Sequence, residues 1–228
     1  MVQLRILNRK RRVDATTAEK FRDLPVANVS DVMHRLNAGG PRLRPLHAGG
    51  PLVGAAFTVK TRPGDNLLVQ QALDMAGPGD VLVIDAGGDL TNSLLGEMML
   101  AYAEKVGITG VVVNGAVRDL GYIQSRKYPV FAAGVTHRGP YRNGPGEINV
   151  PVAIDGMVVE PGDLMLGDED GLLCVPYEMI DEVLAEAIVK HAGEKKLIIE
   201  IASGTNDRSF VAAALKKSGY SFEMSESP

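Results

Sequence analysis

Short runs of apolar residues, each ended by glycine, proline or aspartate, recur between residues 50 and 175. Short runs that are rich in β-branched side chains are typical of buried strands. Pro161-Gly162-Asp163 lies between two such runs and is typical of a tight turn. The pattern predicts strands at Leu52–Val59, Val81–Ile84, Val111–Val113, Val130–Ala132, Val152–Ile154, Met157–Val159, Leu164–Leu166 and Leu172–Val175.

Apolar residues at helical spacing lie between several of these strands and after the last one. They predict helices at Asn66–Met75, at Glu97–Val106 and over residues 177–199, where the apolar stripe indicates core or subunit packing. Strands and helices alternate in the first half of the chain, whereas the second half is richer in strands. This order favours a layered α/β domain with a mixed sheet over a doubly wound fold.

The chain of 228 residues is long enough to bury a sizeable core, and we expect a single domain over residues 1–228. Residues 1–15 are locally basic, and we expect an N-terminal arm there, either flexible or packed on the domain. Residues 204–228 are expected to form a C-terminal extension with a polar, frayed end.

Composition and charge exclude several classes of function. The net charge is −4, tryptophan is absent, and aromatic residues make up 5% of the chain, so nucleic acid is not an expected partner. No apolar run approaches the ~18 residues of a membrane span, and no secretion signal is evident. We therefore expect a cytoplasmic protein with no membrane partner. The single cysteine, Cys174, lies in an apolar run and is expected to be a buried core thiol.

The stretch from Val111 to Asp119 places adjacent Arg118 and Asp119 directly after a buried strand and a glycine. Loops that follow strands commonly carry the chemistry of open α/β proteins. An aspartate there can bind a hard divalent cation, and an arginine offers a planar fork to a carboxylate or an enolate oxygen. A structural ion pair between the two residues is the alternative.

A second stretch, Gly96-Glu97-Met98-Met99, opens the helix predicted at Glu97–Val106. The first amides of a helix lack partners within it and carry partial positive charge, so those of Glu97, Met98 and Met99 are suited to bind a carboxylate. Glu97 either complements the helix dipole or holds a metal-bound water. Together the two stretches suit chelation of a 2-oxo acid and stabilisation of an enolate.

In this order and at this spacing, Gly96–Met99 and Gly115–Asp119 resemble motifs of the family of 4-hydroxy-4-methyl-2-oxoglutarate aldolases and ribonuclease E activity regulator A. The similarity covers most of the chain, from about residue 20 to about residue 200. Further matches to this family are Val29-Ser30-Asp31, Asp65-Asn66, Gly146–Val152, Pro161-Gly162-Asp163 and Asp168–Gly171.

The resemblance implies a layered α/β/α fold, like the swivelling phosphohistidine domain, assembled as homotrimers or homohexamers. It also implies a class II aldolase, which uses Mg²⁺ or Mn²⁺ in place of a lysine Schiff base. Such an enzyme cleaves a 4-hydroxy-2-oxo diacid, for example 4-hydroxy-4-methyl-2-oxoglutarate, to pyruvate. Decarboxylation of oxaloacetate is the expected side activity, because it passes through the same enolate.

The resemblance also assigns roles to residues of the two motifs. Asp119 would be the direct metal ligand, and Arg118 would bind the pyruvyl oxygens and stabilise the enolate. Glu97 would hold a metal-bound water, although the better-known aldolases often have aspartate there, so its reach differs. Gly96 and the backbone amides of Met98 and Met99 would bind the substrate carboxylate.

The family aldolases place a further carboxylate near the metal, through water, from a neighbouring subunit. Glu194 is the candidate here, with a solvated helix face as the alternative. Arg62, Arg138 and Arg142 could bind the distal carboxylate of a diacid or simply lie on the surface. The tail after Ser203 departs from the regulators, which largely lack it, and leaves open what covers the mouth of the site.

Two other functions remain open at this point. The regulator branch of the family gives a protein that inhibits ribonuclease E by binding it, and the same scaffold would also suit a lyase of sugar acids. The histidines are scattered along the chain and show no metal-ligand spacing. A Schiff-base lysine needs a desolvated setting, and nothing in the sequence around Lys60 indicates one.

Overall fold

The computed structural model describes residues 4–221, which fall into two compact units divided between Ile188 and Val189. The first unit contains every strand found in the described residues, and α6 (Ile180–Ser203) begins in it. The second unit contains the rest of α6 and α7 (Ser209–Lys217). Among the described residues, no helix combines the length and the apolar character that crossing a membrane requires.

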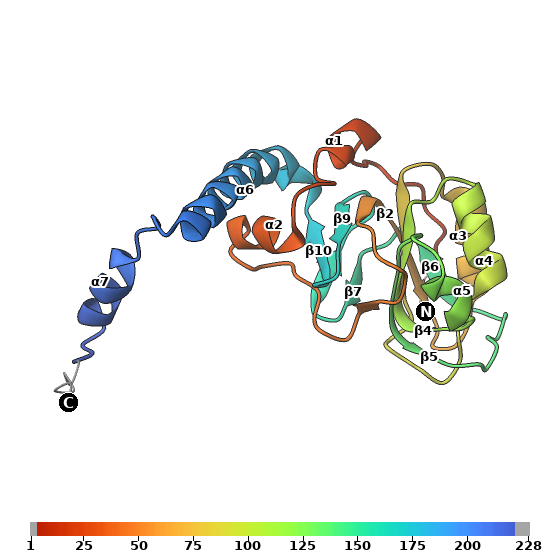
Figure 1. The fold of residues 1–228 in the computed structure, drawn as a ribbon. Helices are drawn as coiled ribbons and strands as arrows, with labels where there is room; N and C mark the ends of the chain where they lie inside the picture. Colours follow the sequence, from red (N-terminus) through yellow and green to blue (C-terminus); the bar gives the residue numbers. More distant parts are fainter. Residues whose placement is uncertain (1–3, 222–228) are drawn as a thin grey trace, which may run out of the picture. The chain divides into compact units, whose positions relative to one another are not determined.

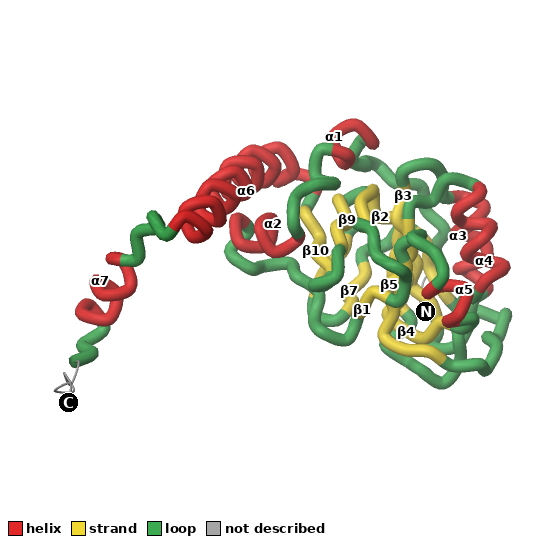
Figure 2. The backbone as a smooth tube through the Cα atoms, in the orientation of Figure 1, coloured by secondary structure: helices red, strands yellow, loops and turns green. Residues whose placement is uncertain are grey.

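A mixed sheet of eight strands forms the centre of the first unit (Figures 1 and 2). Its main path runs β1-β5-β4-β3-β2-β9-β10, and β6 pairs with the end of β2. The neighbours β2, β3, β4 and β5 run parallel, whereas β1, β6, β9 and β10 pair antiparallel with their partners. The strands are β1 (Arg44–Pro45), β2 (Leu52–Thr61), β3 (Asp80–Asp85), β4 (Gly110–Val117), β5 (Val130–Val135), β6 (Gly146–Ile148), β9 (Leu164–Gly167) and β10 (Leu172–Val175).

Short helices and a separate hairpin cover this sheet. The hairpin consists of β7 (Val152–Ile154) and β8 (Met157–Val159), which pair with each other. The remaining helices are α1 (Ala15–Glu19), α2 (Val26–Val32), α3 (Leu67–Met75), α4 (Glu97–Lys105), α5 (Leu120–Gln124) and the 3₁₀ turn η1 (Tyr177–Met179).

Successive side chains along the strands point to opposite faces of the sheet, and both faces pack into hydrophobic core. Along β2, Val53, Phe57 and Val59 face the helices, whereas Leu52 and Ala56 face the β7–β8 hairpin. The helical face packs against α3, α4 and α5 and, beside β9 and β10, against α1, α2 and the first turns of α6. The sheet is thus buried on both sides, which explains why its strands read as continuous apolar runs.

The structure confirms the layered α/β fold with a mixed sheet. Each predicted strand and each of the three predicted helices is present, and β4 and β5 extend a few residues further than their apolar cores. The sequence pattern missed the short elements β1, β6, α1, α2 and α5, and also α7. The short ones are too brief to show a hydrophobic period, and contacts with distant parts of the chain hold them in place.

The N-terminal residues lie along the sheet. Arg5 and Leu7 exchange backbone hydrogen bonds with Ile148, at 2.9 and 3.2 Å. Further along, the Arg9 guanidinium makes two hydrogen bonds, of 2.6 and 2.8 Å, to the carboxylate of Asp80, which is 1% exposed. The same guanidinium lies 5.0 Å from the centre of the Phe57 ring. A buried carboxylate at the start of β3 therefore depends on a cation from the N-terminal segment.

Replacing Arg9 with alanine should lower the free energy of unfolding by about 3–5 kcal/mol, because it leaves the buried Asp80 without its main counter-charge. Denaturant unfolding followed by circular dichroism measures this change. Arg5→Ala is the matched control: it removes a more exposed ion pair, with Glu147, and should cost about 0–1 kcal/mol. Equal losses for the two variants would contradict the assigned role of Arg9.

Candidate functional site

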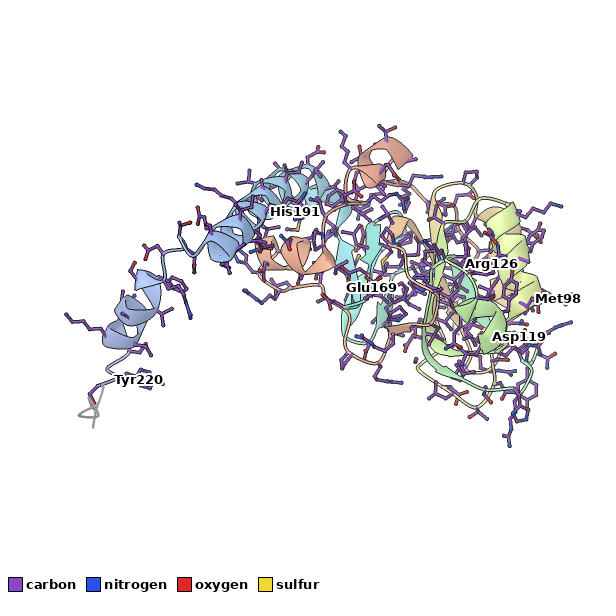
Figure 3. All side chains as sticks on the ribbon, viewed as in Figure 1. Met98, Asp119, Arg126, Glu169, His191 and Tyr220 are labelled. Atoms are coloured by element: carbon purple, nitrogen blue, oxygen red, sulfur yellow. The ribbon has the colours of Figure 1, made fainter. Side chains whose placement is uncertain are left out.

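The N-terminus of α4 meets the end of β4, and this junction brings the two sequence motifs together. The backbone N–H of Glu97 donates to Asp119 Oδ2 at 2.8 Å. The backbone N–H of Arg118 donates to the carbonyl oxygen of Leu95 at 3.0 Å. Gly96–Met99 and Arg118–Asp119 therefore form one site, on the side of the first unit where Figure 3 labels Met98 and Asp119.

Gly96 is required at this junction because no side chain fits there. A Cβ atom at Gly96 would overlap the Asp119 carboxylate and lie 2.7 Å from Arg118 Cγ. Asp119 itself adopts a left-handed backbone conformation, with φ of 62°, where it precedes α5. A non-glycine residue in this region costs of order 1 kcal/mol and is often found at functional sites. The close approach fixes the carboxylate against the start of α4.

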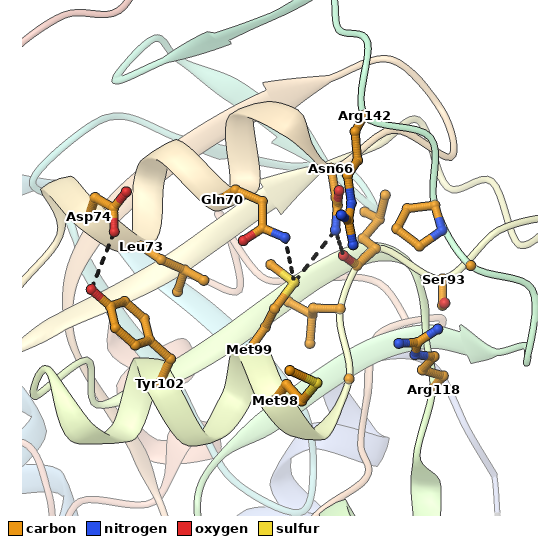
Figure 4. A pocket seen from close by; sticks show the side chains of 15 residues that line it. Asn66, Gln70, Leu73, Asp74, Ser93, Met98, Met99, Tyr102, Arg118 and Arg142 are labelled. Atoms are coloured by element: carbon orange, nitrogen blue, oxygen red, sulfur yellow. Dashed lines mark hydrogen bonds between the residues drawn. The ribbon is translucent and has the colours of Figure 1, made fainter.

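An open pocket of about 580 Å³ lies next to this junction (Figure 4). It lies between α3, the first turns of α4 and the chain around residue 140. Of the predicted site residues, Gly96, Met98, Met99 and Arg118 line it. The other lining residues are Asn66, Gln70, Leu73, Asp74, Ser93, Leu94, Leu95, Tyr102, Gly139, Pro140 and Arg142.

The first turn of α4 presents backbone donors beside the pocket. The first helical bond runs from the N–H of Leu100 to the carbonyl oxygen of Gly96, at 3.0 Å. Within the described part of the chain, the amides of Met98 and Met99 have no backbone or side-chain acceptor. Free amides at a helix N-terminus bind anions, and a carboxylate is the anion that a 2-oxo acid would bring.

The Arg118 side chain lies on the pocket wall (Figure 4) and is 44% exposed. Its Nε lies 3.6 Å from Asp119 Oδ2, which is beyond hydrogen-bonding distance. No described residue accepts a hydrogen bond from its guanidinium. Because exposed pairs at such distances contribute little to stability, a purely structural ion pair explains this arrangement poorly. The guanidinium is positioned to receive an anion in the pocket.

The site has a carboxylate that could bind a hydrated hard cation, but among the described residues it lacks the several protein ligands of a closed metal site. The residues in the described part of the chain include no group of three histidine, cysteine or acidic side chains placed to hold a metal ion. Asp119 offers a partly exposed carboxylate, only one oxygen of which receives the Glu97 N–H. Mg²⁺ keeps several of its waters and is bound through one or two carboxylates, so these residues fit Mg²⁺ or Mn²⁺.

Two predicted acidic residues differ in how they relate to this junction. Glu97 is the first residue of α4, exposed and next to Asp119, and its position also complements the helix dipole. Glu194 belongs to the second unit, where it pairs with Lys190 at 3.0 Å, one helical turn away. The assignments of both side chains to metal-bound waters stay predictions.

The weaker candidates are also placed by the structure. Cys174 is buried, and burial together with the nearby Asp163 charge raises the pKa of its thiol, which makes it a poor nucleophile. Lys60 is exposed near the end of β2. Of the three arginines considered for a distal carboxylate, Arg142 alone lines the pocket, and Arg62 pairs with Asp65 at 3.1 Å.

Asn66 and Gln70 are polar residues of the pocket to which the sequence pattern assigned no role in the site. Asn66 is 1% exposed; its Nδ2 donates to the Leu94 carbonyl oxygen at 2.9 Å, and its Oδ1 has no partner among the described residues. Gln70 and Met99 lie beside it, with Gln70 Nε2 3.6 Å from Met99 Sδ. The sequence feature that could have indicated Asn66 is the polar pair Asp65-Asn66, which lies after a predicted strand, where a predicted helix begins.

Comparison with known proteins agrees with this geometry. A family model described as RraA-like, Aldolase/RraA, matches residues 26–174. A protein of Halalkalibacterium halodurans, named "Putative 4-hydroxy-4-methyl-2-oxoglutarate aldolase", is 39% identical over 176 residues, which cover 77% of this chain and 84% of the relative. A 4-hydroxy-4-methyl-2-oxoglutarate aldolase of Thermus thermophilus is 41% identical over 112 residues, 49% of this chain and 68% of that protein.

Among solved structures, the RNA-processing inhibitor RraA from Thermus thermophilus is similar, with a TM-score of 0.63 and 33% sequence identity. The alignment covers 68% of this chain and 93% of that one. Proteins named for an aldolase and a protein named for inhibition of RNA processing therefore share this fold.

If Asp119 is a metal ligand, as the family resemblance implies, replacing Gly96 with alanine should weaken Mn²⁺ binding by about 10–100-fold, the range typical for residues that orient a metal ligand. The added methyl group would displace the Asp119 carboxylate from the start of α4. Titration calorimetry with Mn²⁺ measures the effect. Gly121→Ala is the control, because a Cβ atom there meets nothing within 4 Å; equal affinities for the two variants would show that Gly96 does not position the ligand.

Proposed function

Because the chain belongs to the RraA-like family, Aldolase/RraA, we propose that it is a carbon–carbon lyase of 4-hydroxy-2-oxo diacids. It cleaves a substrate such as 4-hydroxy-4-methyl-2-oxoglutarate to pyruvate and a second 2-oxo acid. The observation that carries the proposal is the meeting of Arg118 and the free amides of α4 at one pocket. The names of the aldolase relatives support the same reaction class.

The substrate carboxylate would accept hydrogen bonds from the amides of Met98 and Met99. Gly96 lines the pocket beside these amides, and the partial positive charge of the helix N-terminus favours the carboxylate. The Arg118 guanidinium would then face the 2-oxo group from the pocket wall. These donors fix one end of the substrate, whichever group occupies the far end.

Mg²⁺ or Mn²⁺ is the proposed cofactor, with Asp119 as the direct ligand and Glu97 holding one of its waters. When bound, the cation would supply Lewis-acid polarisation of the 2-oxo group. We also propose a homotrimer or homohexamer, in which Glu194 of one subunit would act through water at the neighbouring site. The small-molecule 2-oxo acid is the partner that this arrangement needs, and neither nucleic acid nor a membrane has a part in it.

Arg118 would act on the charge that develops during cleavage. When a base removes the proton of the C4 hydroxyl group, a carbonyl forms at C4 and the C3–C4 bond breaks. The electron pair of that bond passes to the pyruvate enolate, whose oxygen would lie against the guanidinium, and protonation of C3 completes pyruvate. Loss of CO₂ from oxaloacetate produces the same enolate, so oxaloacetate decarboxylation is the proposed side activity.

Arg142 is the best candidate for the far end of the substrate. It lines the pocket together with Asn66 and Gln70, so a second carboxylate would meet a cation and amide groups there. A planar guanidinium can bind a carboxylate through two hydrogen bonds. The pocket therefore favours a diacid over a monoacid.

Arg118→Ala should lower kcat for pyruvate release by about 100-fold or more, because a donor to a developing oxyanion contributes about 3–4 kcal/mol to transition-state stabilisation. Arg35→Ala, which removes an exposed arginine paired with Asp31, should leave kcat near the wild-type value. A coupled pyruvate assay at saturating substrate gives both numbers. Near-normal turnover by the Arg118 variant would refute its assignment.

The alternative function is inhibition of ribonuclease E by direct binding, which the likeness to the RraA structure favours. Both proposals predict a folded, family-like protein, so only activity and binding separate them. A pull-down with purified ribonuclease E tests the alternative. A stable stoichiometric complex, together with no lyase activity, would replace the enzyme proposal with the regulator.

A further inference from the structure

One wall of the pocket is a loop, residues 138–145, which we call the pocket strap. Gly139, Pro140 and Arg142 of the strap line the pocket. At its start, the backbone N–H and the hydroxyl group of Ser93 both donate to the Arg138 carbonyl oxygen at 2.8 Å. Arg142 thus reaches the pocket from a loop and not from the sheet (Figure 4).

The middle of the strap is held by the chain that precedes α3. The N–H of Tyr141 donates to the Gly64 carbonyl oxygen at 2.8 Å, and the N–H of Asn66 donates to the Tyr141 carbonyl oxygen at 3.0 Å. The N–H of Arg62 donates to the Pro145 carbonyl oxygen at 3.1 Å. These backbone hydrogen bonds place the strap beside residues 62–66. The backbone N–H of Asn143, next to Arg142, has a side-chain acceptor instead.

That acceptor is the side chain of Asp65, which has no exposed surface. Its Oδ2 accepts the N–H of Asn143 at 2.7 Å and also receives the Arg62 guanidinium at 3.1 Å. Its Oδ1 accepts the N–H of Leu67 at 3.0 Å, at the start of α3. One buried carboxylate therefore connects the strap, directly after Arg142, to the start of α3, the helix that forms another wall of the pocket.

The surroundings of Asp65 keep it ionised. Burial opposes the charge, but the N–H groups of Asn143, Leu67 and Gly144 and the charge of Arg62 outweigh it and lower the pKa of the carboxyl group. An asparagine at this position would have one acceptor oxygen in place of two, and its NH₂ group would face a backbone N–H. The neutral side chain of the same size therefore cannot hold both segments.

We propose that Asp65 is a positioning residue: it fixes the strap through the Asn143 N–H and so places Arg142 to select substrates with a second carboxylate. The inference rests on the proposed lyase function and names the residue that sets its substrate class. Because Asp65 has no exposed surface, it cannot touch the substrate and would act through Arg142. Its loss should therefore affect diacids more than monoacids.

The test compares Asp65→Asn with wild type on two substrates, 4-hydroxy-4-methyl-2-oxoglutarate and the monoacid 4-hydroxy-2-oxopentanoate, with kcat and KM measured separately. We expect KM for the diacid to rise about tenfold with little change in kcat, the order expected when a hydrogen bond to a charged group is lost. For the monoacid, kcat/KM should stay within about threefold of wild type. Arg142→Gln should give the same pattern.

A double variant shows whether Asp65 acts through Arg142. If it does, Asp65→Asn in the Arg142→Gln background adds no further rise in KM for the diacid, whereas independent effects would multiply. Asp89→Asn is the matched control, because Asp89 accepts the N–H of Thr91, two residues on, at 3.1 Å, as Asp65 does with Leu67, but lies outside the strap. This control should leave both substrates unchanged.

Equal losses on both substrates, or an unchanged KM for the diacid in a folded variant, would overturn the proposal. If Asp65→Asn does not fold, the same measurements are made on Arg62→Gln. Arg62 is exposed, and its substitution removes only one partner of the Asp65 carboxylate. If wild type releases no pyruvate from either substrate, the lyase proposal fails. Hydrogen exchange of the 141–144 amides then decides the structural part, since faster exchange in the variant supports the positioning role and equal exchange refutes it.

Discussion

The hydrogen bond between the Glu97 N–H and the Asp119 carboxylate is the contact on which the site depends. It joins the start of α4 to the end of β4, two places separated by 22 residues in the chain. It forms only because Gly96 has no side chain and because Asp119 adopts a left-handed backbone conformation. Each of these two features belongs to a single residue at the junction. Neither residue is part of the hydrophobic core, so packing of the core does not explain them.

This junction produces a local charge pattern that the whole molecule does not have. The chain carries a net charge of −4, yet the helix N-terminus and Arg118 concentrate positive potential at one pocket. The Asp119 carboxylate adjoins that region and supplies the negative charge that a cation needs. This arrangement suits the proposed function, because chelation of a 2-oxo acid requires an anionic substrate and a divalent cation side by side.

The hydrophobic pattern predicted the sheet and its three longer helices because both faces of the sheet are buried and the strands read as apolar runs. The two site motifs were also predictable, since strand ends and helix starts are local features of the sequence. The pocket strap, Asn66 and the place of Arg142 were not. They depend on contacts between segments far apart in the chain, such as that of Asp65 with Asn143. The role proposed for Glu194 depends on a neighbouring subunit, whose placement cannot be read from the pattern of one chain.

Pyruvate release by the wild-type protein from 4-hydroxy-4-methyl-2-oxoglutarate, measured with Mg²⁺ and again with EDTA, tests the central claim most directly. We predict release that requires the metal, with slower or comparable release of pyruvate from oxaloacetate under the same conditions. Release that persists in EDTA would contradict the role given to Asp119. No release from either substrate would contradict the proposed reaction and leave the ribonuclease E complex as the function to examine.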